Sequence, residues 1–180
     1  MLAASQKGFL IPPGLAIAAL SDKAISRMQN TNLPRYYLDF RKYAQFKEIG
    51  ETPFTPNISL VLAMNQACEF LLNDYGLDAY YQHHRDLSDY LSQQLESRGL
   101  DIGVVAPENR GQVLVAVRVK DGWNARDIHD ALDEKGYIIA TGFGDYKTKI
   151  LRIAVIGDVG KDDIDKFLVV FDQTIEELYG

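Results

Sequence analysis

The stretch Val113-Leu-Val-Ala-Val-Arg-Val119 is a run of aliphatic, mostly β-branched residues, and it predicts a strand. Asn124 then offers a helix cap, and Gly136 stands just past the end of a helix running through Lys135. A second run, Lys149-Ile-Leu-Arg-Ile-Ala-Val155, predicts another strand. The order strand, helix, strand favours an α/β domain in this part of the chain.

The flanking segments extend this pattern in both directions. Tyr137-Ile-Ile-Ala140 predicts a short third strand. The last helix carries apolar residues on one stripe, namely Ile164, Phe167, Leu168, Phe171, Ile175 and Leu178. We therefore expect residues 100–180 to form a small C-terminal α/β domain with a three-stranded sheet and covering helices.

Two helices are expected before this domain. Apolar residues recur at spacings of three and four from Leu60 to Leu71, which predicts an amphipathic helix ending near Gly76. A second helix should run from about Asp78 to Arg98, with Gly99 after it. We interpret residues 58–99 as connecting helices.

Residues 1–57 have a different character. The unbroken apolar run at 15–20 predicts a strand buried on both faces, and Ser21-Asp22 should cap a short helix after it. Helical spacing returns over 36–46, and two prolines at 51–56 predict a rigid extended connector.

Composition excludes several classes of function. The 180 residues are 47% apolar and 24% charged, with a net charge of −6 and no basic block, which argues against binding to nucleic acid or an anionic membrane.

The single cysteine, Cys68, cannot form an internal disulfide or a cysteine metal cage. The adjacent His83 and His84 are poorly spaced for a metal and are expected on an exposed helix face, so no metal site is predicted. Because the sequence also has no spanning apolar run and no signal peptide, we expect a cytoplasmic protein.

Lys7 is the first candidate for chemistry. It precedes an apolar run, where a lysine is costly unless it is paired, deprotonated or covalently used. Lysine amines are the usual nucleophiles toward carbonyl compounds, including aldehyde cofactors. The alternative is an ordinary exposed lysine near a terminus. Because the first residues lack the polar character of a domain start, we also expect that this terminus marks a truncation.

Four ordered motifs resemble one enzyme family. They are Ser5-Gln-Lys-Gly-Phe-Leu-Ile-Pro-Pro-Gly14, Tyr36-Tyr-Leu-Asp-Phe40, Thr52-Pro-Phe-Thr-Pro56 and Lys149-Ile-Leu-Arg-Ile-Ala-Val-Ile-Gly157. Together they are similar to segments of the class V aminotransferases, the fold-type I pyridoxal-phosphate enzymes that include serine–pyruvate and alanine–glyoxylate aminotransferases. The resemblance implies the C-terminal portion of that fold, with residues 1–57 as a remnant of the large cofactor-binding domain.

The resemblance also implies roles for single residues. Lys7 takes the place of the lysine that binds pyridoxal phosphate and shuttles the proton. Gln6 and Thr55 match phosphate-contacting positions, with Thr55 serving the partner's site in a homodimer, and Thr52 is a weaker candidate for that role. Arg152 matches the arginine that binds the substrate carboxylate. Without the resemblance, Arg152 would be an edge-strand arginine held by a surface carboxylate, and the threonines would be turn residues.

Amino transfer from serine or alanine to glyoxylate or pyruvate is the reaction that the resemblance implies. In the family, the acid that pairs with the pyridine nitrogen, the stacking aromatic residue and the phosphate-binding helix start precede the lysine, so we expect the chain alone to be inactive. The alternative is a non-catalytic folding or association module. Cysteine desulfurases share the fold, but they need a cysteine on a loop, and Cys68 lies within a predicted helix.

Overall fold

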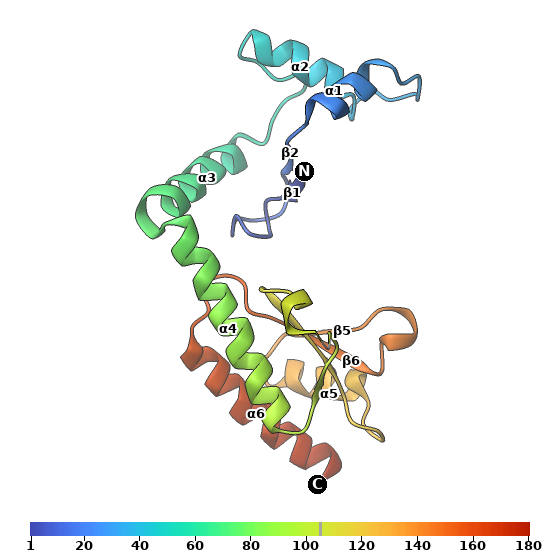
Figure 1. Ribbon diagram of the computed structural model, residues 1–180, viewed down its shortest axis with the longest axis vertical. Coiled ribbons are helices and arrows are strands. Elements are labelled where there is room, and N and C mark those ends of the chain that lie inside the picture. The colour runs from blue at the N-terminus through green and yellow to red at the C-terminus, as the bar shows by residue number, and fades with distance from the viewer. Residues whose placement is uncertain (105) are drawn as a thin grey trace. The chain divides into compact units, whose positions relative to one another are not determined.

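The computed structural model describes residues 1–104 and 106–180, which divide into two compact units, Met1–Asp74 and Tyr75–Gly180 (Figure 1). The boundary lies inside the segment expected to connect two domains. The helix after it packs against the sheet and the last helix, so it belongs to the second unit.

The first unit begins with a two-stranded antiparallel hairpin. Strand β1 (Leu2–Ala4) pairs with β2 (Ala16–Ala18), and Ala3 lies opposite Ile17. The expectation that 15–20 forms a strand buried on both faces is wrong for this chain, because Ala16 and Ala18 are exposed and β2 has one neighbour among the described strands. The apolar run is therefore half of a hairpin.

Three helices follow the hairpin, each with a side-chain cap. Helix α1 (Asp22–Gln29) is capped by Ser21, as predicted, α2 (Phe40–Glu48) by Asp39, and α3 (Ile58–Glu69) by Asn57. The backbone continues from α3 into a π-helical turn, η1 (Phe70–Tyr75). Helix α2 begins later than the helical spacing suggested, since the Asp39 carboxylate accepts a hydrogen bond from Arg41 N and fixes the first turn.

Asp39 also forms the best-connected ion pair of the first unit. Its Oδ2 lies 2.7 Å from Arg41 Nη2, and its Oδ1 lies 3.5 Å from Arg35 Nε. Asp39 as a whole is 6% exposed. The hydrogen bonds from the Arg41 side chain, more than any other cause, hold the pKa of Asp39 well below its usual range.

We expect Asp39→Asn to remove an acid-sensitive part of the stability. The lowered pKa favours the folded state when Asp39 is ionised, so its contribution is complete above about pH 4 and is lost as the pH falls through the folded-state pKa. The difference in the free energy of unfolding between wild type and variant should therefore shrink from about pH 6 to about pH 3. Urea titrations at both pH values measure it, and a difference independent of pH would contradict the assignment.

The second unit is an antiparallel sheet covered by helices. Its helices are α4 (Leu77–Ser97), α5 (Ala125–Glu134) and α6 (Lys161–Tyr179), and its strands are β3 (Asp101–Ile102), β4 (Leu114–Arg118), β5 (Ala140–Thr141) and β6 (Ile150–Ala154). Short 3-10 turns, η2 (Pro107–Asn109) and η3 (Gly144–Tyr146), lie in its loops. Among the described residues the strand order is β3-β4-β6-β5, so the small α/β domain is confirmed, with four described strands where three were expected.

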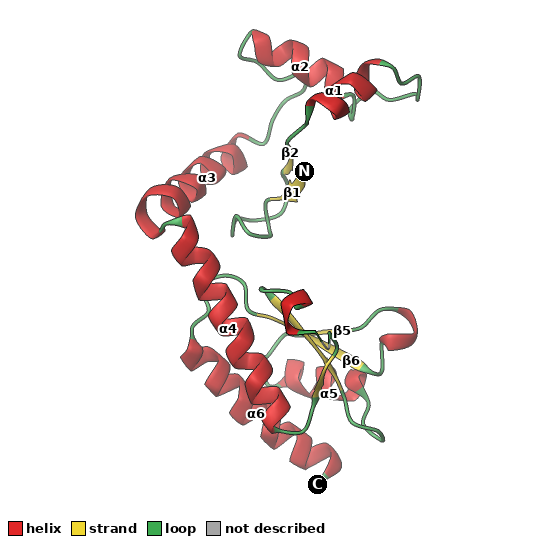
Figure 2. Ribbon diagram, viewed as in Figure 1, coloured by secondary structure: helices red, strands yellow, loops and turns green. Residues whose placement is uncertain are grey.

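The core lies on one face of this sheet. Val115 and Val117 of β4 alternate with exposed or half-buried neighbours, and Leu151 and Ile153 of β6 do the same. These side chains pack against Leu91 and its neighbours on α4 and against residues of α5 and α6. Figure 2 shows α4 and α6 running side by side next to the sheet. Arg152 alternates with the buried residues of β6, so its side chain lies on the opposite face of the sheet.

Candidate functional site

Lys7 lies in the loop that joins β1 to β2. This loop is closed at its base by Ser5 N, which donates to Leu15 O at 3.1 Å. Inside it, Lys7 N donates to Ala4 O at 3.1 Å, and Leu10 N donates to Lys7 O at 3.0 Å. The lysine backbone is therefore fixed by hydrogen bonds on both sides.

Ser5 occupies the interior of the loop and is fully buried. Its hydroxyl donates to Pro12 O at 2.8 Å and accepts from Leu15 N at 3.1 Å, while its carbonyl accepts from Ile11 N at 3.3 Å. One small side chain thus satisfies backbone groups across the whole loop. The interior of this segment therefore holds a serine, whereas the lysine two residues later is exposed.

The exposed side chains of the loop are free to meet a ligand. Within the described chain, neither Lys7 Nζ nor the Gln6 side chain has a hydrogen bond or ion pair. An unpaired amine suits an aldehyde, and an amide donates to a phosphate oxygen without adding charge. These two residues fit the cofactor that the resemblance implies.

Gly14 connects this loop to the segment that follows Thr55. A Cβ atom at Gly14 would lie 2.5 Å from Leu60 Cδ1 and 3.8 Å from Asn57 Nδ2, and the φ of Gly14 is +145°. Only glycine allows this approach. The end of the Lys7 loop therefore lies against the N-terminus of α3, two residues beyond Thr55.

The two candidate threonines differ in how their hydroxyls are used. Thr52 Oγ1 donates to Phe54 O at 2.8 Å, so Thr52 serves the turn, as the simpler alternative predicted. Thr55 is exposed, and its hydroxyl has no partner among the described residues. Phe54 anchors the segment between them, with its ring centroid 5.0 Å from that of Tyr37 and 5.4 Å from that of Tyr36.

Arg152 lies in the middle of the second unit's sheet. Its strand, β6, has neighbours on both sides, and the residues paired with Arg152 are Ala116 and Ala140. Arg152 Nε donates to Thr141 O at 2.7 Å, and Phe143 lies over the guanidinium with its ring centroid 4.2 Å from Cζ. No carboxylate of the described chain forms an ion pair with it. The alternative of an edge-strand arginine held by a surface carboxylate is therefore wrong for this chain.

The structure brings some of the predicted residues together. Gln6 and Lys7 share one loop, and Thr52 and Thr55 share one turn of the same unit. Arg152 belongs to the second unit.

The paired histidines correct one expectation. His84 is 2% exposed, and its Nδ1 lies 2.9 Å from Tyr80 O, while its Nε2 has no hydrogen-bond partner among the described residues. His83 Nε2 lies 3.0 Å from Val159 O. Both rings therefore turn toward the protein. Within residues 1–104 and 106–180, no three His, Cys, Asp or Glu side chains are grouped so that they could hold a metal ion, and no helix could cross a membrane.

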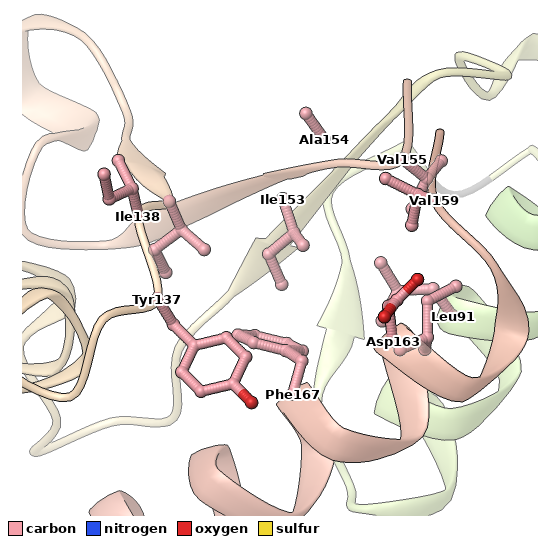
Figure 3. A pocket seen from close by; sticks show the side chains of 11 residues that line it. Leu91, Tyr137, Ile138, Ile153, Ala154, Val155, Val159, Asp163 and Phe167 are labelled. Carbon is pink, nitrogen blue, oxygen red and sulfur yellow. The ribbon is translucent and has the colours of Figure 1, made fainter. Parts of the chain in front are cut away.

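A hollow of about 180 Å³ lies on the helical side of the sheet (Figure 3). The hollow lies where β5 is shorter than predicted. Residues 137–139 do not pair with β6, and both this segment and the chain around the end of β6, at Ile153 and Val155, line the hollow. Its lining residues are apolar apart from Tyr137 and Asp163, and the Asp163 carboxylate caps α6 by accepting from Gly160 N at 2.9 Å. None of the predicted site residues lines it.

Sequence reasoning missed three residues that shape the candidate sites, Ser5, Phe54 and Phe143. Ser5 lies two residues before the lysine and was given no role, although serine hydroxyls often hydrogen-bond to nearby backbone groups in loops. Phe143 lies between two glycines shortly before the arginine strand, and nothing in that pattern indicates a contact with Arg152.

Comparison with known proteins agrees with these features. The family described as Aminotransferase class-V matches residues 1–166. The chain is 33% identical over 156 residues to the L-aspartate–glyoxylate aminotransferase of Paracoccus denitrificans, a match that covers 86% of this chain and 39% of that protein. It is 31% identical over 175 residues to a protein named as the small subunit of a soluble hydrogenase of Synechococcus, covering 97% and 45% of the two chains.

Among solved structures, the alanine–glyoxylate aminotransferase of Nostoc superposes with a TM-score of 0.87 and 26% identity. That match covers 97% of this chain and 47% of the other. The chain thus spans less than half the length of these relatives. Because the family match extends over most of the sequence and the fold agrees, the chain belongs to the class-V aminotransferase family.

Proposed function

We propose that this chain supplies the lysine and the arginine of an aminotransferase that moves an amino group from a small amino acid, such as serine or alanine, to a 2-oxo acid, such as glyoxylate or pyruvate, and that the 180 residues alone do not catalyse the reaction. The presentation of an unpaired Lys7 amine on a hairpin closed by Ser5 carries this proposal. Names of relatives support it, since the proteins from Paracoccus and Nostoc are both named as aminotransferases that use glyoxylate. We follow these names and the family match rather than the hydrogenase name of the third relative.

Pyridoxal phosphate is the cofactor of this family. When bound, it supplies an aldehyde that accepts the amino group and a ring that delocalises electrons from the reacting carbon. In this chain, Lys7 Nζ would hold the aldehyde end. Gln6 and Thr55 would donate hydrogen bonds to the phosphate, and neither adds a charge beside the lysine.

The remaining roles fall to proton transfer and substrate binding. Lys7 Nζ, which has no competing partner in the described chain, would move the proton at the substrate carbon. Arg152 would bind the substrate carboxylate through its two Nη groups, because its Nε is already bonded to Thr141 O. The expected division into a large-domain part (1–57), connecting helices (58–99) and a small domain (100–180) belongs to this proposal.

The competing function is a folding or association module that uses no cofactor. Incubation of the full 180-residue chain with pyridoxal phosphate, followed by borohydride reduction and peptide mass mapping, separates the two functions. Preferential modification of Lys7 over the other lysines is expected if the lysine chemistry is retained. Equal labelling of all exposed lysines would favour the module.

A homodimer is the expected assembly. Thr55, which the resemblance assigns to the partner's site, is followed directly by α3, where Ile58 and Leu62 are 63% and 66% exposed. A helix with apolar residues on its outer face is usually covered, and we assign a second copy as the cover. We expect light scattering to give twice the monomer mass and Leu62→Glu to halve it. Val169→Glu on α6, also exposed, is the matched control, and a monomeric wild type would contradict the assembly.

The proposal also includes a cytoplasmic location. Its support is the single cysteine, which fits a reducing compartment.

A further inference from the structure

We propose that Phe143 is a positioning residue for carboxylate binding at Arg152. The inference rests on the proposed function, in which Arg152 binds the substrate carboxylate. It adds that an aromatic ring at 143 keeps the guanidinium in its binding orientation and shields one of its faces.

The guanidinium is held in two ways that leave its outer edge open. Its Nε donates to Thr141 O at 2.7 Å, which fixes the direction of the side chain along the edge nearest the backbone. The Phe143 ring centroid lies 4.2 Å from Cζ, which covers one face. Neither Nη1 nor Nη2 has a hydrogen bond with the described residues. These two nitrogens can donate hydrogen bonds together to the two oxygens of one carboxylate.

The strand neighbours leave room for that ligand. Arg152 is flanked across the sheet by Ala116 and Ala140, whose side chains end at Cβ. Successive residues of a strand point to opposite faces, so Arg152 lies on the face opposite Leu151 and Ile153, which pack in the core. Small neighbours on the open face therefore allow a small carboxylate to approach.

The loop that carries Phe143 is built tightly. A Cβ atom at Gly142 would lie 2.4 Å from Tyr146 O, so the turn closes only with glycine at this position. Tyr146 N donates to Phe143 O at 3.0 Å, and Gly142 N donates to Ile150 O at 2.8 Å. The backbone of residue 143 is thus fixed by bonds to the turn and to the arginine strand.

The exposure of Phe143 points to a role other than core packing. The side chain is 75% exposed, and it takes no part in the core cluster. Its recorded partner is the Arg152 cation, which the negative face of the ring attracts. An aromatic ring in this place stabilises the cation and also limits the rotamers that Arg152 can adopt. The side chain of Arg152 therefore loses less conformational entropy when a carboxylate binds.

Nuclear magnetic resonance of the ¹⁵N-labelled full chain tests this role. The Nε–Hε signal of Arg152, identified by its loss in Arg152→Lys, is followed while pyruvate is added. Phe143→Leu keeps an apolar side chain without the ring, and Phe143→Tyr keeps the ring. Tyr146→Leu makes the same aromatic-to-aliphatic change three residues later in the same loop, on an exposed side chain.

We expect Phe143→Leu to weaken pyruvate binding about two- to fivefold, the range that a cation–π contact at an exposed site supports. It should also remove the ring-current shift of the Arg152 signal. Phe143→Tyr should restore both, and Tyr146→Leu should change neither. Pyruvate binding by Phe143→Leu equal to wild type, or an equal loss in Tyr146→Leu, would overturn the inference while Arg152 kept its proposed role. Because Arg152→Lys has no Nε–Hε signal at this position, its pyruvate binding is followed by the backbone amide signals of β6, and binding equal to wild type would overturn both.

Discussion

Lys7→Ala is expected to abolish the selective, borohydride-stable attachment of pyridoxal phosphate to this chain. The amine of Lys7 has no hydrogen-bond or ion-pair partner among the described residues, and the loop around it is fixed by Ser5. The variant removes the amine and leaves every backbone bond of the loop in place. Mass spectrometry of the reduced, digested protein should show the loss of the modified peptide that contains residue 7.

Lys23→Ala provides the matched control for this experiment. Lys23 is an exposed lysine in the first turn of α1, in the same unit as Lys7. Its loss should leave the modification at Lys7 unchanged. If wild type and Lys7→Ala took up the same amount of cofactor on the same peptides, the assignment of Lys7 would be wrong, whatever the fate of Arg152.

Leu151→Ala is expected to lower the free energy of unfolding of the second unit by about 2–5 kcal/mol. Leu151 is fully buried in the core, on the strand that also carries Arg152. Shortening it leaves a cavity between the sheet and the helices in addition to the lost apolar transfer energy. Urea denaturation followed by circular dichroism measures the change as a lower midpoint.

Ile138→Ala is the control for this effect. Ile138 precedes β5 and is 85% exposed, so its removal should change the midpoint little. Equal destabilisation by both variants would mean that the burial of Leu151 does not set the stability of the unit. Labelling of Lys7 by pyridoxal phosphate is a second measurement. It should be unchanged in Leu151→Ala, because Lys7 belongs to the first unit.

Local signals in the sequence predicted much of the fold. Ser21 and Asn124 cap helices where they were expected to, because a short side-chain oxygen can reach the free N–H groups of the first turn in nearly any context. Gly99 and Gly136 follow helices with φ of +73° and +85°, a conformation that glycine adopts without strain. The runs at 113–119 and 149–155 contain β4 and β6, since alternating buried positions need apolar residues there.

Features that depend on distant contacts could not be predicted in this way. Strand β3 is two residues long and is defined by its pairing with β4. Asp101 and Ile102 are too few to show the alternation of apolar and polar residues that predicts a strand. His84 is buried by the packing of α4, and a pair of adjacent histidines does not reveal which ring will point inward.

In the candidate site too, the motifs identified some residues, whereas those that act through distant contacts could not be predicted. Lys7, Gln6, Thr55 and Arg152 were assigned from motifs that resemble a family, and their catalytic and binding roles remain predictions. What holds them was not visible in the motifs. Ser5 bonds to backbone groups up to ten residues away, and Phe143, in the loop before β6, contacts the Arg152 cation on that strand. Such contacts depend on the turn geometry, which composition and spacing do not encode.

The buried hydroxyl of Ser5 has a consequence for how this loop can be altered. Ser5 closes the loop from within, and a Cβ atom added at Gly8 would meet no atom within 4 Å. Leu10 already adopts a φ of +57°, where glycine or asparagine would be accommodated with less strain. Position 10 is therefore a natural place for divergence or for directed evolution, because it can be exchanged to change the surroundings of the amine while Ser5 keeps the loop closed.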